Sequence, residues 1–102
     1  MKHAGAEALD QLEDLLVKLR SHETLVEKSR GCFYRKSSAF LHFHEDPAGM
    51  FGDLKIGGEF ERFRVSTAKE QAAFLRAVAG ELAVLSPAAP RAARSRDTRR
   101  GA

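Results

Sequence analysis

The sequence contains a single cysteine, Cys32, among its 102 residues. An intrachain disulfide is therefore excluded, and so is a metal cluster held by several thiolates of one chain. No apolar run approaches the roughly 20 residues that a membrane-spanning helix needs. The acidic beginning of the chain lacks the basic and apolar segments of a signal peptide. We therefore expect a cytoplasmic protein.

The net positive charge of the chain does not come from its main part, where acidic residues balance the basic ones. The formal net charge is +3, but residues 86–102 contain five arginines and one aspartate, a charge of +4, which leaves −1 for residues 1–85. We expect a single α+β domain over residues 1–85 and a disordered, arginine-rich basic tail over residues 86–102. Such a tail either binds nucleic acid weakly, through counterion release, or is only a solvated extension.

Two segments have the periodicity of helices. Between Ala4 and about Arg20, leucines recur every three or four residues and so lie on one helical face. These are Leu9, Leu12, Leu16 and Leu19. The second helix is expected to begin at a capping box formed by Thr67 and Glu70 and to end before Pro87. Its predicted buried residues are Leu75, Val78, Leu82 and Leu85.

Between the helices the apolar period changes to two, which is typical of strands. The predicted strands cover residues 32–35, 39–45, 50–56 and 59–65. Short turns between successive strands require antiparallel pairing. We therefore expect a four-stranded antiparallel meander with an N-terminal and a C-terminal helix packed on one face. Residues 21–29 either extend the first helix or form a loop and a short strand; we expect a break near Ser21.

Alternation along the strands sorts the side chains onto two faces of the sheet. The predicted core face is apolar: Cys32, Tyr34, Leu41, Phe43, Met50, Leu54, Ile56, Phe63 and Val65. The opposite face mixes aromatic and charged residues: Phe33, Arg35, Phe40, His42, His44, Phe51, Asp53, Lys55, Phe60, Arg62 and Arg64. The assignment requires strict alternation, since one β-bulge exchanges the faces after it.

Phenylalanines on a face that would otherwise be polar indicate an interaction surface. We expect a non-enzymatic interaction module that either self-associates as a homodimer or binds a partner. The expected interface residues are Phe33, Phe40, Phe51, Phe60, Arg62 and Arg64. The alternatives are a ligand pocket, a surface that stacks nucleic-acid bases, or a face partly covered by a helix. No residue is assigned a catalytic role, and no cofactor-binding motif is identified.

The histidines of the His42-x-His44 pair point the same way on a strand, and Asp53 on the next strand is expected on the same face. Two imidazoles and a carboxylate suit zinc, iron or manganese, so these three residues form a candidate site for a divalent metal. The alternative function is therefore that of a metal-binding protein or a metal-dependent enzyme. Half-buried histidines that hydrogen-bond to Asp53 or to the backbone would explain the pattern equally well. His3 and His22 are isolated in the sequence and receive no role.

The segment from Phe40 to Asp46, followed by the segment from Gly49 to Leu54, resembles a stretch of the small bacterial proteins catalogued as "luciferase domain" proteins. In that group the stretch reads as hydrophobe, glycine, histidine, hydrophobe, histidine and acid, followed by a small residue and Asp-Leu. Leu41 stands where the group usually has glycine, and the group's later aromatic-histidine segment is missing. The resemblance implies that His42, His44 and Asp53 are the positions of interest. It implies neither light emission nor a substrate.

Overall fold

The computed structural model describes residues 1–85, and the predicted basic tail, residues 86–102, lies outside the described residues. In chain order the elements are β1 (Lys2–His3), α1 (Ala6–Gln11), α2 (Glu13–Arg20), β2 (Val26–Ser29), β3 (Cys32–Arg35), β4 (Ser38–Asp46), β5 (Gly49–Ile56), β6 (Glu59–Arg64) and α3 (Ala68–Leu85). The predicted α+β class, with helices on both sides of the strand region in the sequence, is confirmed. No helix within the described residues is long and apolar enough to cross a membrane.

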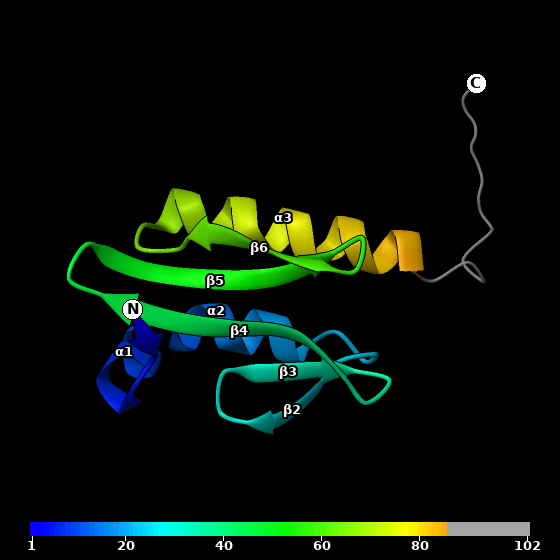
Figure 1. Ribbon diagram of the computed structural model, residues 1–102, viewed down its shortest axis with the longest axis horizontal. Helices are drawn as coiled ribbons and strands as arrows, with labels where there is room; N and C mark the ends of the chain where they lie inside the picture. Colours follow the sequence, from blue (N-terminus) through cyan, green and yellow to red (C-terminus); the bar gives the residue numbers. More distant parts are fainter. Residues whose placement is uncertain (86–102) are drawn as a thin grey trace.

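The sheet is an antiparallel meander in the order β2-β3-β4-β5-β6 (Figure 1). The four predicted strands correspond to β3–β6, so the meander is confirmed but the predicted number of strands was too low. The sequence left residues 21–29 open between two alternatives. In the structure α2 ends at Arg20, just before this segment, and the segment contains β2. The additional strand β1 pairs with β4 beyond the end of β3, at the same edge of β4.

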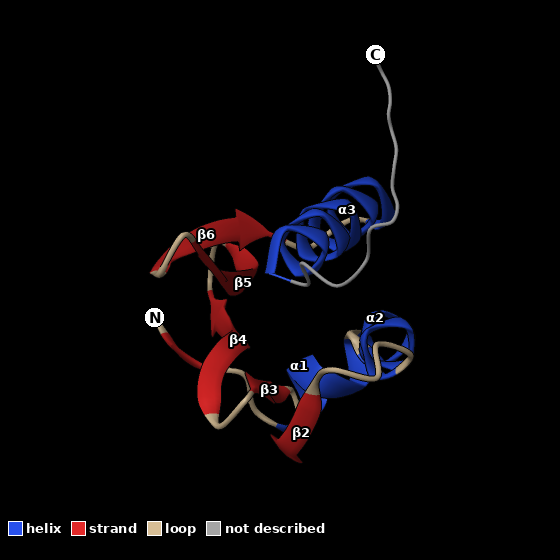
Figure 2. Ribbon diagram, turned by 90° about the vertical axis from the view of Figure 1, so that its right-hand side faces the viewer, coloured by secondary structure: helices blue, strands red, loops and turns tan. Residues whose placement is uncertain are grey.

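All three helices lie on one side of the sheet, and the strands curve around them (Figure 2). The predicted leucine face of the first helical segment is buried, and Leu12 lies where α1 meets α2. The capping box of α3 is also present. The Glu70 amide donates to Thr67 Oγ1 at 3.1 Å, and the Thr67 amide donates to Glu70 Oε1 at 3.0 Å. The sequence missed Phe74, which is fully buried on α3, whereas Leu75 is only partly buried.

A β-bulge between β3 and β4 makes part of the predicted face assignment wrong. Phe33 lies opposite Leu41 and Tyr34 opposite Ala39, which leaves Phe40 as the extra residue. Phe33 and Phe40 are only 1% and 2% exposed and belong to the core instead of the mixed face. On β3 the two faces are exchanged, because Phe33 faces the helices in place of Tyr34. From Leu41 onward, the predicted alternation holds on β4 and β5.

Arg35, like Phe33, lies on the side of β3 opposite to the one expected from the sequence. It was expected on the mixed face, but its guanidinium donates to the carbonyl oxygen of Leu85 at 2.8 Å, at the end of α3. A long cationic side chain thus reaches the last turn of a helix, where the exposed carbonyls favour positive charge. The first strand of the predicted meander therefore turns phenylalanine and arginine toward the helices.

The glycine in the middle of β5, Gly52, allows a close contact between the sheet and α3. A Cβ atom added at Gly52 would lie 2.9 Å from the ring of Phe74 and 3.1 Å from that of Phe43. Such distances are shorter than the contacts that packed side chains make. The absence of a side chain at this position therefore lets Phe74 lie directly against the strand.

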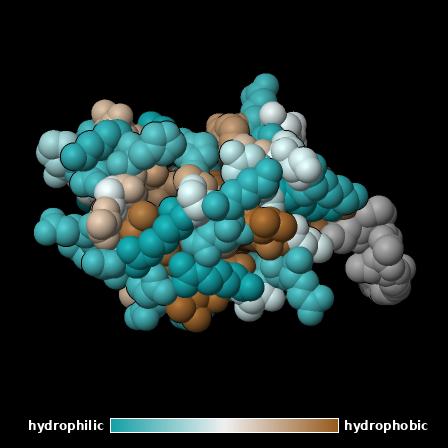
Figure 3. All heavy atoms as spheres, turned by 90° about the horizontal axis from the view of Figure 1, so that it is seen from below, coloured by the Kyte–Doolittle hydropathy of each residue, from teal (hydrophilic) through white to brown (hydrophobic). Residues whose placement is uncertain are grey.

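Large hydrophobic side chains are exposed at separate places on the surface. Among the described residues they are Met1, Val17, Val26, Phe60 and Val84. Figure 3 shows one side of the molecule, on which hydrophilic atoms separate smaller hydrophobic patches. Scattered exposed residues of this kind are normal for folded proteins.

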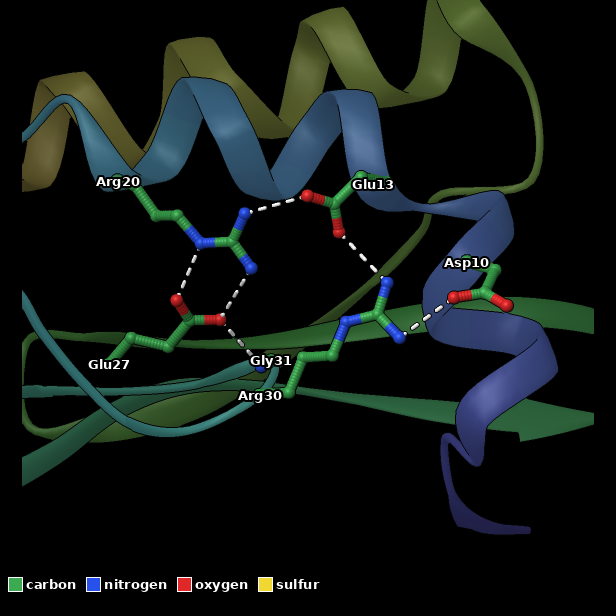
Figure 4. A network of polar contacts seen from close by, with 6 residues as sticks. All are labelled: Asp10, Glu13, Arg20, Glu27, Arg30 and Gly31. Carbon is green, nitrogen blue, oxygen red and sulfur yellow. Dashed lines mark hydrogen bonds and ion pairs between the residues drawn. The ribbon is translucent and has the colours of Figure 1, made fainter.

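A network of ion pairs joins the β2–β3 turn to α1 and α2 (Figure 4). Arg20 pairs with Glu27 at 2.6 Å and with Glu13 at 2.8 Å, while Arg30 pairs with Glu13 at 2.9 Å. Arg30 also pairs with Asp10 at 2.8 Å, and the amide of Gly31 donates to Glu27 at 2.9 Å. The hairpin at the edge of the sheet is thus attached to the helices by side chains from both.

Candidate functional site

The side of the sheet that faces away from the helices (Figure 2) is called the open face below. The strand register arranges its side chains in rows across the strands. In one row His42 of β4 lies opposite Asp53 of β5, and Asp53 lies opposite Arg62 of β6. Directly opposite residues of antiparallel strands point to the same face. The tight turn between β4 and β5 fixes this register and so brings His42 and Asp53 together.

The neighbouring row contains the second histidine of the pair. His44 lies opposite Phe51, and Phe51 lies opposite Arg64. On the other side of His44, β1 adds His3 to the same row. Figure 1 shows the N-terminal segment beside β4. The two rows together place three histidines on adjoining positions of the open face.

Asp53 is the centre of this group and is only 7% exposed. Its Oδ2 lies 3.4 Å from His42 Nε2 and 3.2 Å from His44 Nε2. Arg62 donates two hydrogen bonds of 2.8 Å, one to each carboxylate oxygen. These hydrogen bonds hold the pKa of Asp53 below its usual value, although burial alone would raise it. The Asp53 carboxylate is therefore ionised at neutral pH.

His42 and His44 differ in their surroundings. Burial lowers the pKa of His42 and outweighs the nearby charge of Asp53, which acts in the opposite direction. At neutral pH His42 is therefore the uncharged imidazole, the form that binds metal ions. The Nδ1 atom of His44 is buried without a hydrogen-bond partner among the described residues. That ring lacks the second hydrogen bond that usually orients a metal-ligating histidine.

The distances in this cluster suit one metal ion. One ligand atom each from His42, His44 and Asp53 can be chosen so that all three lie within 4.8 Å of one another. Ligands about 2.1 Å from a tetrahedral zinc ion lie about 3.4 Å from each other. The separations of 3.4 and 3.2 Å between the imidazole nitrogens and the Asp53 oxygen are close to that value. The structure thus brings together the three residues that the sequence selected, while metal binding itself stays a prediction.

The predicted interface residues are divided between the two sides of the sheet. Phe51, Phe60, Arg62 and Arg64 lie on the strands of the open face, whereas Phe33 and Phe40 are in the core. Phe60 is 44% exposed, and its ring centroid lies 5.0 Å from that of His42. The Lys55 ammonium lies 5.3 Å from the same ring.

His3 is the residue of this cluster that sequence reasoning missed. Its ring centroid lies 4.8 Å from that of His44 and 5.7 Å from that of His42. No local pattern could have indicated this position, because β1 is only two residues long. A strand so short is defined by the strand with which it pairs and not by its own periodicity.

Comparisons of this chain with protein-family models, with curated proteins and with solved structures found no match. The resemblance of residues 40–54 to the "luciferase domain" proteins therefore stays a prediction. The candidate site is defined by its geometry alone.

Proposed function

We propose that this domain binds a divalent transition-metal ion, in the first place zinc, through His42, His44 and Asp53. The observation that supports the proposal is the position of the two imidazole Nε2 atoms, 3.4 and 3.2 Å from one ionised carboxylate oxygen. The three residues project from the paired strands β4 and β5, so little rearrangement is needed to surround an ion. Two nitrogens and one oxygen are a ligand set that zinc accepts.

Arg62 competes with a metal ion for Asp53, because its guanidinium binds both carboxylate oxygens. The ion must therefore share the carboxylate with Arg62 or displace it. The Arg62 side chain is 49% exposed, so it can turn into solvent when an ion binds. His42 and His44 can bind the ion whether or not Arg62 leaves Asp53. Their nitrogen ligands favour zinc over manganese, which prefers oxygen ligands.

The direct test is zinc binding to protein that has first been stripped with a chelator. Calorimetry is expected to give one zinc ion per chain, and thermal unfolding is expected to shift upward. At a free zinc concentration of 100 times Kd, the stabilisation is about 2.7 kcal/mol. His42→Ala and His44→Ala are expected to remove most of it, because each loses a ligand.

The matched control is His22→Ala, which changes a histidine beyond the end of α2, away from the cluster. This variant should bind zinc like the wild-type protein. A wild-type protein that gains no thermal stability from zinc, manganese or iron would contradict the proposal. Equal zinc binding by His42→Ala and the wild-type protein would contradict it as well.

A second candidate function is self-association of two copies through the open face. The supporting observation is Phe60, which is 44% exposed between His42 and Lys55. Burial of Phe33 and Phe40 leaves Phe51 and Phe60 as the phenylalanines of this face, which is why the proposal comes second.

We also propose a cytoplasmic location, supported by the free thiol of Cys32, because free thiols are common in proteins of reducing compartments.

A further inference from the structure

The short strand β1 brings a third imidazole to the candidate metal site. His3 lies opposite His44 in the sheet, so their side chains share the open face. The His3 centroid lies 4.8 Å from that of His44 and 5.7 Å from that of His42, and the His42 and His44 centroids are 4.9 Å apart. The three rings thus form a nearly equilateral group around one point of the surface.

These separations agree with the geometry of three imidazoles around one ion. With nitrogens about 2.0–2.1 Å from a tetrahedral ion, the ring centroids lie about 5 Å from each other. All three measured separations are near this value. His3 is exposed, so its ring can change rotamer to direct a nitrogen at the ion without disturbing packed neighbours.

We propose that His3 is the fourth protein ligand and that the bound ion fastens β1 to β4. The inference rests on the proposed metal binding by His42, His44 and Asp53. The other contacts of this segment include its pairing with β4 and an ion pair between the Met1 ammonium and Asp46 at 3.8 Å. The Ala4 amide donates to the Phe43 carbonyl at 3.1 Å, and the Gly5 amide donates to the Glu45 carboxylate at 2.6 Å. A two-residue strand with such limited pairing opens easily unless something else holds it.

The fourth ligand determines the kind of site. Three protein ligands leave one position of a tetrahedral ion open to water or substrate, as in catalytic zinc sites. Three histidines and one aspartate fill all four positions, as in structural zinc sites. The proposed role of the ion is therefore to hold the N-terminal segment on the sheet and not to activate a water molecule.

The test combines zinc calorimetry with amide hydrogen exchange followed by NMR on the full chain. The variants are His3→Ala and, as control, His22→Ala. His3→Ala is expected to bind one zinc ion with affinity lower by at least about tenfold. Loss of an outer-shell partner of a ligand already has an effect of this size, and His3 is proposed as a ligand itself. In the wild-type protein, zinc should slow exchange at the amides of Ala4 and Gly5. In His3→Ala it should leave that exchange unchanged although zinc is bound.

The outcomes separate this inference from the proposed function. Zinc binding by His3→Ala with wild-type affinity, together with unchanged slowing at Ala4 and Gly5, overturns the role of His3 and leaves the three-residue site intact. A wild-type protein that binds no zinc overturns both. Circular dichroism of the zinc-free proteins verifies that His3→Ala is folded, as expected for a change at an exposed residue.

Discussion

Asp53 has two kinds of partner on the open face, a guanidinium and two imidazoles. Hydrogen bonds from Arg62 keep the pKa of Asp53 low, so the Asp53 carboxylate is ionised and can accept a hydrogen bond or bind a metal ion. His42 and His44 approach the oxygen Oδ2 from β4. We therefore expect the affinity of the proposed metal site to depend on how strongly Arg62 holds the Asp53 carboxylate.

We expect Arg62→Gln to raise the affinity for zinc by about two- to fivefold, the small effect expected for the loss of a partly exposed ion pair. The physical reason is that the ion no longer shares Asp53 with a cation. Titration calorimetry measures the change. Arg64→Gln is the control, because Arg64 pairs with Glu70 at 3.5 Å instead of Asp53. Weaker zinc binding by Arg62→Gln would indicate that Arg62 positions Asp53 for the ion.

At the level of single residues, the sequence predicted what strand alternation determines. His42, His44 and Asp53 could be assigned to one face because they lie on two strands joined by a recognisable turn. Phe33 and Phe40 could not be assigned correctly, because the bulge between β3 and β4 leaves no local signal in the sequence. His3 joins the site through strand pairing with a residue far away in the chain.

Among the elements, the β2–β3 hairpin depends most on side-chain ion pairs. Glu27 accepts hydrogen bonds from Arg20 and from the Gly31 amide, and the Arg20 interaction is the main cause of its lowered pKa. A carboxylate with a lowered pKa stabilises the folded state above its unfolded pKa. This stabilisation is lost as the pH falls through the folded pKa.

Glu27→Gln is therefore expected to lower the free energy of unfolding at neutral pH by about 1 kcal/mol. The difference from the wild-type protein should shrink as the pH falls below the usual pKa of a glutamate and through the lowered pKa of folded Glu27, because the side chain then becomes protonated. Urea unfolding at several pH values measures it. Exposed Glu23→Gln serves as the control. A difference that is constant over this range would show that the ionised carboxylate is not the cause.

The elements differ in how well the sequence predicts them. The capping box of α3 and the leucine period of α1 and α2 are local signals, so helices in these segments could be predicted. The sequence predicted one helix up to about Arg20, however, and not its division into α1 and α2 at Leu12. The strand β2 is short and largely exposed, and its ion pairs with α2 come from tertiary structure. Its residues therefore gave an ambiguous pattern.

At the scale of the whole molecule, helices cover one side of the sheet and the open face carries the exposed ring of Phe60. If two copies associate through this face, sedimentation equilibrium at high micromolar concentration should give a dimer. Phe60→Glu should give a monomer, because a charge replaces the buried apolar contact. Val84→Glu is the control, since Val84 is exposed on α3. A wild-type protein that is monomeric throughout would contradict self-association.

The general architecture could be predicted because the turns between strands are short. Consecutive strands joined in this way must be antiparallel neighbours, and the helical segments before and after them must cover the apolar face. The strand β1 could not be predicted, since it pairs with a strand distant in sequence. The strand β2 was only one of two alternatives for residues 21–29, since it depends on charged residues of the helices.

Gly52 links the two sides of the sheet. It leaves room for Phe74 on the helix side, and the next residue, Asp53, points to the open face. Any side chain at position 52 would move the ring of Phe74 or tilt β5, and a tilt would carry the Asp53 carboxylate away from His42 and His44. A substitution in the core at Gly52 would therefore also alter the position of Asp53 on the open face. An alanine at position 52 would keep that position if a smaller residue replaced Phe74.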